Sequence, residues 1–196
     1  LDMAGGDLIT TDITRPLSET GGAILELNGR PGLRPHYVTS TPARDVAGAA
    51  IDYLFPEPHR GRIPTVVVTG TNGKTTTCRM TARILEASGL TVGLTSTTGI
   101  SIGGQPVAPG DKAGTRGAMT VLRDPSVEAA VLEMARGGFL AGGLGLEHFD
   151  VGVLTNVTLD HLGTGGIDTL EQMAQVKRRI VETARRTVVL NAEDIY

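Results

Sequence analysis

TVVVTGTNGKTTT, at residues 65–77, decides the fold of this chain of 196 residues. Its first five residues are all β-branched, which favours a buried strand. The strand runs into the loop Gly70-Thr71-Asn72-Gly73 and then into Lys74, where the pattern predicts that a helix begins. Glycines let backbone N–H groups turn toward an anion, and the positive end of the helix points to the same place. The stretch therefore predicts a strand–loop–helix unit that binds phosphate.

The loop carries most of the P-loop pattern of nucleotide-binding proteins. The pattern G-x-x-x-x-G-K-[ST] requires a glycine at position 68, where this chain has Val68. The strand-to-helix setting is kept, with Lys74 as a cation for the outer phosphates and a threonine hydroxyl for Mg²⁺. The alternative is an ordinary turn with an exposed lysine. We expect ATP and Mg²⁺, held by Gly70, Thr71, Asn72, Gly73, Lys74, Thr75 and Thr76.

Composition excludes several classes of partner. The chain is 40% apolar with a net charge of −3, so it lacks the basic field that attracts nucleic acid. No long apolar run predicts a membrane span. Cys78 is the only cysteine, which excludes an internal disulfide, suits a reducing compartment and favours buried packing over chemistry. We expect a cytoplasmic homo-oligomer that binds neither nucleic acid nor membranes.

Hydrophobic patterns divide the chain in two. Short runs predict strands at 7–13 and 23–27, helical spacing predicts a helix at 43–54, and a linker is expected at 55–64. Beyond it strands and helices alternate, which indicates an α/β domain with a parallel sheet and helices on both faces. The expected strands are 64–69, 91–95, 128–133, 150–155 and 187–190, the expected helices are 74–87 and 169–185, and a glycine-rich loop is expected at 103–117.

Polar residues follow the strands on one edge of this sheet, where ligands of parallel sheets bind. Glu133 ends one strand, and Asn156 and Asp160-His161 follow another. Taken singly, Glu133 is explained as a solvent-facing strand end and His161 as a hydrogen-bonded structural histidine. Because they share an edge with the loop, we expect Glu133 and His161, with Thr75 or Thr76, to hold Mg²⁺ around ATP, with Asp160 orienting the histidine or a water.

The helix expected at 169–185 has a lysine on its apolar stripe. Asp168 and Glu171 have the spacing of a capping box, so we expect them to begin the helix. Lys177 lies on the stripe, where an ammonium must find an anion, reach solvent or lose its charge. Reaching solvent is the ordinary outcome, and a role beside the nucleotide is the alternative.

Together these motifs resemble the central domain of Mur ligases. The stretches that carry the resemblance are 70–77, 133–138, Asn156 with 160–162, and 190–194. Upstream, GAILELNGRPG at 22–32 resembles the end of an ATP-grasp domain, whose Glu-x-Asn pair binds magnesium. An ATP-grasp tail followed directly by a Mur ligase domain is the arrangement of cyanophycin synthetases.

The resemblance implies domain boundaries and a second metal site. Residues 1–42 would be the end of an ATP-grasp domain, 43–63 a helix and linker, and 64–196 an incomplete Mur ligase central domain. Glu26 and Asn28 lie two apart on a strand and so face one side, where their oxygens suit one metal ion. Similarity to ATP-grasp enzymes adds Asp7 as a third ligand, and a polar strand face open to water is the alternative. Since position 1 is Leu1, we expect an excerpt that completes neither reaction alone.

The resemblance also implies a reaction. ATP would phosphorylate a carboxylate, and an incoming amine would displace phosphate. Aspartate would be added to a polymer backbone at the ATP-grasp site, and arginine to the aspartate side chain at the Mur-like site. The expected partners are ATP, aspartate, arginine and a peptide-like primer. Similarity to Mur ligases implies a carbamylated lysine at Lys177 that helps to hold Mg²⁺, and the expected catalytic residues are Lys74, Glu133, His161 and Lys177.

Departures from the family pattern leave the substrate open. GDKAGTRGA at 110–118 differs from the GD-x-TGP-x-SA usual in cyanophycin synthetases, and Met134 stands where threonine is common. One alternative is another Mur-type ligase of the peptidoglycan or folylpolyglutamate type. A P-loop kinase or regulatory NTPase is disfavoured by Val68, Glu133 and His161, and a nucleotide-binding remnant without activity is the third alternative.

Overall fold

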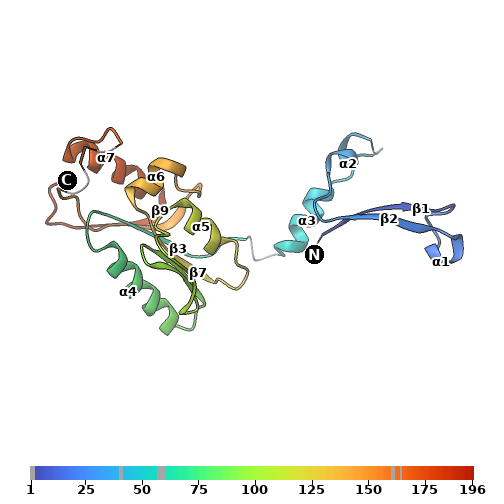
Figure 1. The fold of residues 1–196 in the computed structure, drawn as a ribbon, viewed down its shortest axis with the longest axis horizontal. Coiled ribbons are helices and arrows are strands. Elements are labelled where there is room, and N and C mark those ends of the chain that lie inside the picture. The colour runs from blue at the N-terminus through green and yellow to red at the C-terminus, as the bar shows by residue number, and fades with distance from the viewer. Residues whose placement is uncertain (1–2, 40–41, 57–60, 160–161, 164) are drawn as a thin grey trace. The chain divides into compact units, whose positions relative to one another are not determined.

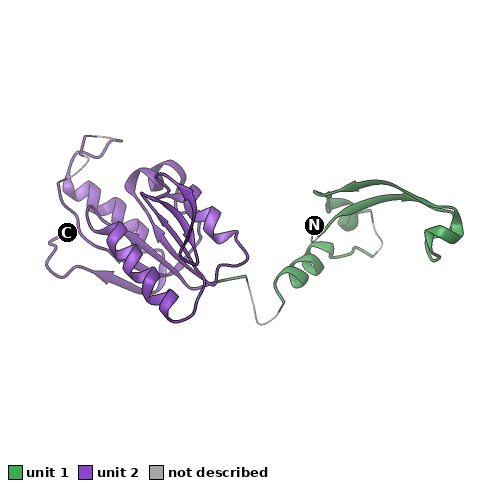
Figure 2. Cartoon of the chain, turned by 60° about the horizontal axis from the view of Figure 1, so that its bottom comes forward, with its two compact units in different colours: residues 1–62 green, residues 63–196 purple. Residues whose placement is uncertain are grey.

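The computed structural model describes residues 3–39, 42–56, 61–159, 162–163 and 165–196. It divides into two compact units, Leu1–Arg62 and Ile63–Tyr196, which Figure 2 colours separately. No helix in the described ranges combines the length and apolar character needed to cross a bilayer.

The first unit is a two-stranded antiparallel ribbon with short helices. The strands are β1 (Gly5–Ile9) and β2 (Ala23–Asn28), and the helices are α1 (Leu17–Thr20), α2 (Arg34–Val38) and α3 (Val46–Leu54). The strand expected at 7–13 is thus wrong at its far end. Asp12 Oδ1 accepts hydrogen bonds from both the backbone N–H and the hydroxyl of Thr14, at 2.9 and 2.7 Å. These bonds form a local turn in which the side chain, not a partner strand, satisfies the backbone.

Helix α3 begins later than the expected residue 43. Asp45 is its N-cap, and its Oδ1 accepts from the backbone N–H of Gly48 at 2.8 Å. The hydroxyl of Tyr37 donates to the same oxygen at 2.6 Å, which connects α2 to the start of α3. The Tyr37 hydroxyl, followed by the Gly48 amide, lowers the pKa of the Asp45 carboxyl. The helix start is therefore fixed by a capping carboxylate that also holds a neighbouring helix.

The second unit is a seven-stranded sheet with helices on both faces, as expected (Figure 1). Its strand order is β6-β5-β4-β7-β3-β8-β9, and the five strands from β4 to β9 in this order run parallel. Strand β3 (Thr65–Thr69) lies between β7 and β8, so the loop that follows it emerges among other strand ends. The other parallel strands are β4 (Val92–Ser96), β7 (Ala129–Glu133), β8 (Phe149–Leu154) and β9 (Ala184–Leu190).

Alternate residues of the central strands belong to two hydrophobic cores. Val68 joins Cys78 and Ala82 of α4 (Lys74–Ala87) in one core. Val67 joins Ala118 of α5 (Thr115–Leu122) and Ile180 of α7 (Leu170–Val181) in the other. Because neighbouring side chains of a strand point to opposite faces, the cores lie on opposite sides of the sheet. This two-sided burial explains why β3 is a continuous β-branched run.

The glycine-rich loop expected at 103–117 is confirmed only at residues 110–114. Strands β5 (Gly99–Ile102) and β6 (Gln105–Pro109) form an antiparallel hairpin that extends the sheet beyond β4, and α5 follows. Gly103 and Gly104 both have positive φ, 54° and 76°, and connect the two strands. Such glycine pairs favour two-residue hairpin turns, so these glycines indicate strand pairing and not an irregular loop.

Helix α7 ends earlier and is capped differently than expected. Thr169 is the N-cap: its side chain accepts from the N–H of Gln172 at 3.2 Å, and Gln172 Oε1 accepts from the N–H of Thr169 at 3.2 Å. The expected pair of Asp168 and Glu171 is therefore displaced by one residue. The chain leaves the helix after Val181 and enters β9, so the helix predicted to reach residue 185 is too long.

Candidate functional site

The phosphate loop, residues 70–74, follows β3 with backbone geometry that glycine permits. Gly70 has a φ of 146° and Gly73, the N-cap of α4, has a φ of 82°. A Cβ at Gly70 would collide with Thr155 Oγ1, whereas one at Gly73 would meet no described atom within 4 Å. Gly70 is thus required by both conformation and packing, and Gly73 by conformation.

Asn156 holds the loop from the end of β8. Its Oδ1 accepts from the N–H of Asn72 at 2.9 Å, and its Nδ2 donates to the Asn72 carbonyl at 3.1 Å. Its own carbonyl accepts from the N–H of Thr71 at 2.9 Å. The structure therefore places Asn156 beside the loop, as the sequence suggested, with its side-chain amide bonded to the loop backbone.

Lys74 also bonds to the loop. Its Nζ donates to the carbonyl oxygen of Thr71 at 2.7 Å and is partly buried. A cation held over the loop lies where a phosphate bound to the loop amides would accept from it. The phosphate-binding role of Lys74 stays a prediction.

Glu133 and Thr75 meet at the edge of the sheet. The hydroxyl of Thr75 donates to Glu133 Oε2 at 2.8 Å, and the backbone N–H of Thr97 donates to the same oxygen at 3.3 Å. The hydroxyl of Thr75 also lies 3.2 Å from that of Thr97. Thus β7, α4 and the end of β4 converge on one carboxylate. Thr76, the other hydroxyl considered from the sequence, is exposed.

The Glu133 carboxylate is deeply buried and only half satisfied. Its side chain is 1% exposed, and its Oε1 has no hydrogen-bond partner among the described residues. The hydroxyl of Thr69, at the end of β3, is likewise buried without such a partner. Buried polar atoms are normally paired, and a carboxylate oxygen beside a threonine hydroxyl suits a hard cation. The residues present therefore fit Mg²⁺.

Lys177 is buried, not extended into solvent. It is 3% exposed and lies on the inner face of α7 with Met173 and Ile180. It lines a cavity of about 330 Å³ that opens beside the phosphate loop. This loop cavity is lined by Gly70, Thr71, Lys74, Thr97, Asp111, Ala135, Arg136, Gly137, Met173 and Lys177.

The other expected ligands belong to the first unit or lie outside the described residues. His161 and Asp160 lie outside the described residues. In the first unit, Asp7 is the cross-strand partner of Glu26, so the two carboxylates share a face of the ribbon. Asn28 Oδ1 accepts from the N–H of Arg30 at 3.0 Å, so this oxygen already forms a local turn. No described group of three His, Cys, Asp or Glu residues is placed to hold a metal.

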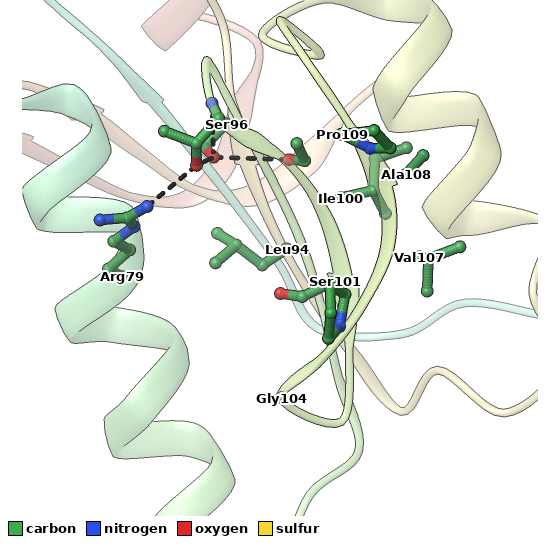
Figure 3. Close-up of a pocket in the computed structure, with 12 residues that line it drawn as sticks. Arg79, Leu94, Ser96, Ile100, Ser101, Gly104, Val107, Ala108 and Pro109 are labelled. Carbon is green, nitrogen blue, oxygen red and sulfur yellow. Dashed lines mark hydrogen bonds between the residues drawn. The ribbon is translucent and has the colours of Figure 1, made fainter.

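Two further cavities flank the sheet. One of about 610 Å³ adjoins the loop cavity and shares three of its residues, Asp111, Ala135 and Gly137. The other, of about 340 Å³, lies between α4 and the β5–β6 hairpin and shares none (Figure 3). There the Arg79 guanidinium donates to the Thr98 hydroxyl at 2.9 Å. The hairpin cavity is thus separate from the phosphate loop.

Cys78 takes no part in the site. Its side chain is fully buried in the core beneath α4. Burial, and secondarily the charge of Glu133, raises the pKa of its thiol. A thiol that resists ionisation is a poor nucleophile, so the sequence-based reading of Cys78 as packing agrees with the structure.

Comparison with known proteins gives this geometry a family. The model of the Mur ligase middle domain matches residues 68–196. This chain belongs to the Mur ligase middle-domain family. A cyanophycin synthetase of Geminocystis herdmanii is 53% identical over 197 residues, which cover 99% of this chain and 22% of that protein. The chain therefore spans less than a quarter of the length of this relative.

Solved structures support the Mur-type fold. A UDP-N-acetylmuramoyl-L-alanyl-D-glutamate--2,6-diaminopimelate ligase has a TM-score of 0.59 and 27% identity, over 74% of this chain and 30% of that one. A complex of FPGS with AMPPCP has a TM-score of 0.50 and 25% identity, over 66% of this chain and 40% of that one. The resemblance to Mur ligases seen in the sequence is confirmed.

Several residues at the site were missed from the sequence. Thr97 bonds to both Thr75 and Glu133, and Thr155 donates to the Asn72 carbonyl at 2.6 Å. Both follow strands whose carboxyl ends reach the site edge, which is the signal that could have found them. Arg136 was noted only as part of a motif, yet it lines the loop cavity.

Proposed function

We propose that this chain carries the ATP site of an amide-forming ligase of the cyanophycin synthetase type. The observation that carries the proposal is the buried Glu133 carboxylate, bonded through one oxygen to Thr75 beside the phosphate loop. This arrangement suits a nucleotide whose phosphates are held by loop amides and a divalent cation. AMPPCP, an ATP analogue, is bound in a relative of the same fold, which supports ATP as the nucleotide.

The chemistry requires positioning and charge neutralisation, with no protein nucleophile. The γ-phosphoryl group would pass from ATP to a carboxylate, and an amine would then displace phosphate to form the amide. Loop amides and Lys74 would bind the phosphates and stabilise the charge that develops on the transferred group. Thr75 and Glu133, with His161, would hold Mg²⁺, which supplies further charge neutralisation when bound. We also propose that Lys177, which is buried and lines this cavity, is carbamylated and helps to hold Mg²⁺.

The proposal extends to two sites in the intact protein. The cyanophycin synthetase relative matches 99% of this chain, and so spans the first unit as well as the Mur ligase domain. Asp7, Glu26 and Asn28 are proposed to bind Mg²⁺ at an ATP-grasp site that adds aspartate. The Mur-like site would add arginine to the side-chain carboxylate of the growing polymer. Both reactions use ATP and a peptide-like primer in the cytoplasm, the first with aspartate and the second with arginine.

Phosphate release from the intact protein tests this function. We expect release only when aspartate or arginine is supplied with a primer. Lys74→Ala should abolish arginine addition, because the loop loses its cation, while aspartate addition stays measurable. Mass spectrometry of the polymer distinguishes the two additions.

Two results would contradict the proposal. Phosphate release that does not depend on aspartate or arginine would favour another Mur-type ligase or a simple NTPase. Full arginine addition by Lys74→Ala would contradict the assignment of the phosphate loop. Arg83→Ala, which removes an exposed cation from the same helix as Lys74, provides the matched control for loss of a positive charge, since arginine addition should survive.

A further inference from the structure

Gly137 is a glycine that neither conformation nor packing explains. It lies in α6 (Arg136–Gly142), and its φ is not among the positive values that favour glycine. A Cβ added there would meet no described atom within 4 Å. Glycine within a helix destabilises it by about 1 kcal/mol relative to alanine, so glycine at position 137 lowers the stability of α6.

The neighbouring glycines of α6 are different. A Cβ at Gly138 would lie 2.7 Å from the Cα of Gly114, and one at Gly142 would lie 3.0 Å from Thr115 Oγ1. Close packing of α6 against the start of α5 therefore explains both. The same explanation fails for Gly137, whose Cβ would project into open space.

That open space joins two cavities. Gly137, Asp111 and Ala135 line both the loop cavity and the larger cavity beside it. A side chain at Gly137 would stand at this junction. We call the larger cavity the small-residue trough; its lining is Asp111, Lys112, Ala113, Gly114, Thr115, Arg116, Gly117, Ala135, Gly137, Gly138, Ala141 and Gly142.

The small-residue trough presents accessible main-chain groups and positively charged side chains to a ligand. Most of its lining residues are glycine or alanine, which leave main-chain groups accessible to an extended chain. Lys112 and Arg116 are its cations, and Arg136 and Lys177 continue the positive charge into the loop cavity. Asp111 Oδ1 accepts a hydrogen bond from the N–H of Ala113 at 2.9 Å, so this oxygen is already bonded to the backbone beside it. The combination suits an extended chain bearing carboxylates.

We propose that Gly137 is a specificity-determining residue, which keeps open the passage through which a side-chain carboxylate of a peptide-like acceptor reaches the ATP phosphates. The acceptor chain lies in the small-residue trough, with Lys112 and Arg116 facing its carboxylates. This inference rests on the proposed ligase function, and it adds the path and the chemical class of the acceptor. A methyl group at Gly137 would narrow the passage without touching the phosphate loop.

Gly137→Ala and Gly137→Val in the intact protein test this path. We expect the KM for an oligo-aspartate acceptor to rise about tenfold with the larger side chain and less with alanine, because one or two carbons in a fitted passage discriminate on this scale. The KM for ATP should stay within about twofold of the parent value. Calorimetry should show weaker binding of an oligo-aspartate peptide to the variants and unchanged binding of AMPPCP.

Controls separate the path from folding. Gly137→Ala should raise or maintain the Tm, since alanine favours a helix. Ala87→Val enlarges an exposed side chain at the end of α4 that lines neither cavity, and it should change neither KM. Arg116→Ala should weaken oligo-aspartate binding and leave AMPPCP binding intact.

Three outcomes would overturn the inference. Unchanged acceptor affinity in both Gly137 variants would show that the space is not used by acceptor. An equal loss of AMPPCP binding would assign the space to the nucleotide. Failure of the parent protein to bind oligo-aspartate would exclude the proposed acceptor class. By contrast, acceptor binding without phosphate release would contradict the ligase function and leave the acceptor path intact.

Discussion

Thr75 contributes one hydroxyl to two neighbours, Glu133 and Thr97. Its distance of 2.8 Å to Glu133 Oε2 makes it a side-chain donor to a carboxylate that is almost completely buried. Hydrogen bonds to charged groups contribute more than neutral ones, and a buried charge that loses a partner is costly. The stability of the site should therefore depend on this hydroxyl before any nucleotide binds.

Thr75→Val tests that dependence. Valine keeps the shape and removes the donor, so we expect the free energy of unfolding to fall by about 1–3 kcal/mol. Nucleotide affinity should fall as well, because the threonine oxygen is lost beside the phosphate loop. Denaturant unfolding and calorimetry with AMPPCP measure the two effects. Thr75→Ser, which restores the hydroxyl, should recover most of both, and full stability of the valine variant would contradict the argument.

Residue types at the site could be predicted, and their partners only partly. Glu133 was noticed because an acid is unusual at the end of a buried strand, and Lys177 because a cation is unusual on an apolar stripe. Thr97 and Thr155 gave only the weaker signal of following strands whose carboxyl ends reach the site edge, and a threonine after a strand is common. Their contacts depend on which strand ends adjoin in space, which sequence order does not reveal.

At the scale of elements, α7 depends on its first turn. Thr169 and Gln172 exchange two hydrogen bonds across that turn, and the helix presents Lys177 to the loop cavity. Loss of a capping side chain typically destabilises a protein by about 1 kcal/mol. The cap therefore supports the element that positions a buried lysine.

Thr169→Ala should lower the free energy of unfolding by about 1 kcal/mol, because the N–H of Gln172 loses its acceptor. Asp168→Asn removes the acid from the pair first suggested by the sequence and should cost no more than about half as much, since only a dipole interaction is weakened. Denaturant unfolding measures both. A larger loss of stability in Asp168→Asn than in Thr169→Ala would instead support a capping box formed by Asp168 and Glu171.

Elements with one strong pattern were predicted well, and mixed patterns were not. The β-branched run of β3 and the apolar spacing of α4 gave bounds that match the structure closely. The β5–β6 hairpin was missed because the glycines of its turn were taken as part of a loop. Helix α6 was also missed, since RGGFLAG has low helix propensity and forms where it packs on α5.

At the scale of the whole molecule, each unit carries its own candidate metal residues. Thr75 and Glu133 belong to the second unit, whereas Asp7 and Glu26 face each other on the ribbon of the first. Under the proposed function these are two ATP sites with different products. Substitutions in one unit should therefore leave the chemistry of the other unit intact.

Glu26→Gln in the intact protein tests this independence. The amide keeps the shape but weakens metal binding, so we expect aspartate addition to fall at least tenfold. Arginine addition to a primer that already bears free aspartate carboxylates should stay near the parent rate. Product analysis by mass spectrometry measures both steps. Parallel loss of the two activities would contradict separate sites.

The burial of Val68 explains the one departure of this chain from the P-loop pattern. Its side chain is fully buried in the core beneath α4, two residues before the loop begins. A glycine there would leave a void under the helix that carries Lys74 and Thr75. In this protein the core packing of β3 continues almost to the loop, so the segment available to bind phosphate is limited to the five residues 70–74. A search that requires the first glycine of the P-loop pattern would miss chains in which a buried core residue occupies that position.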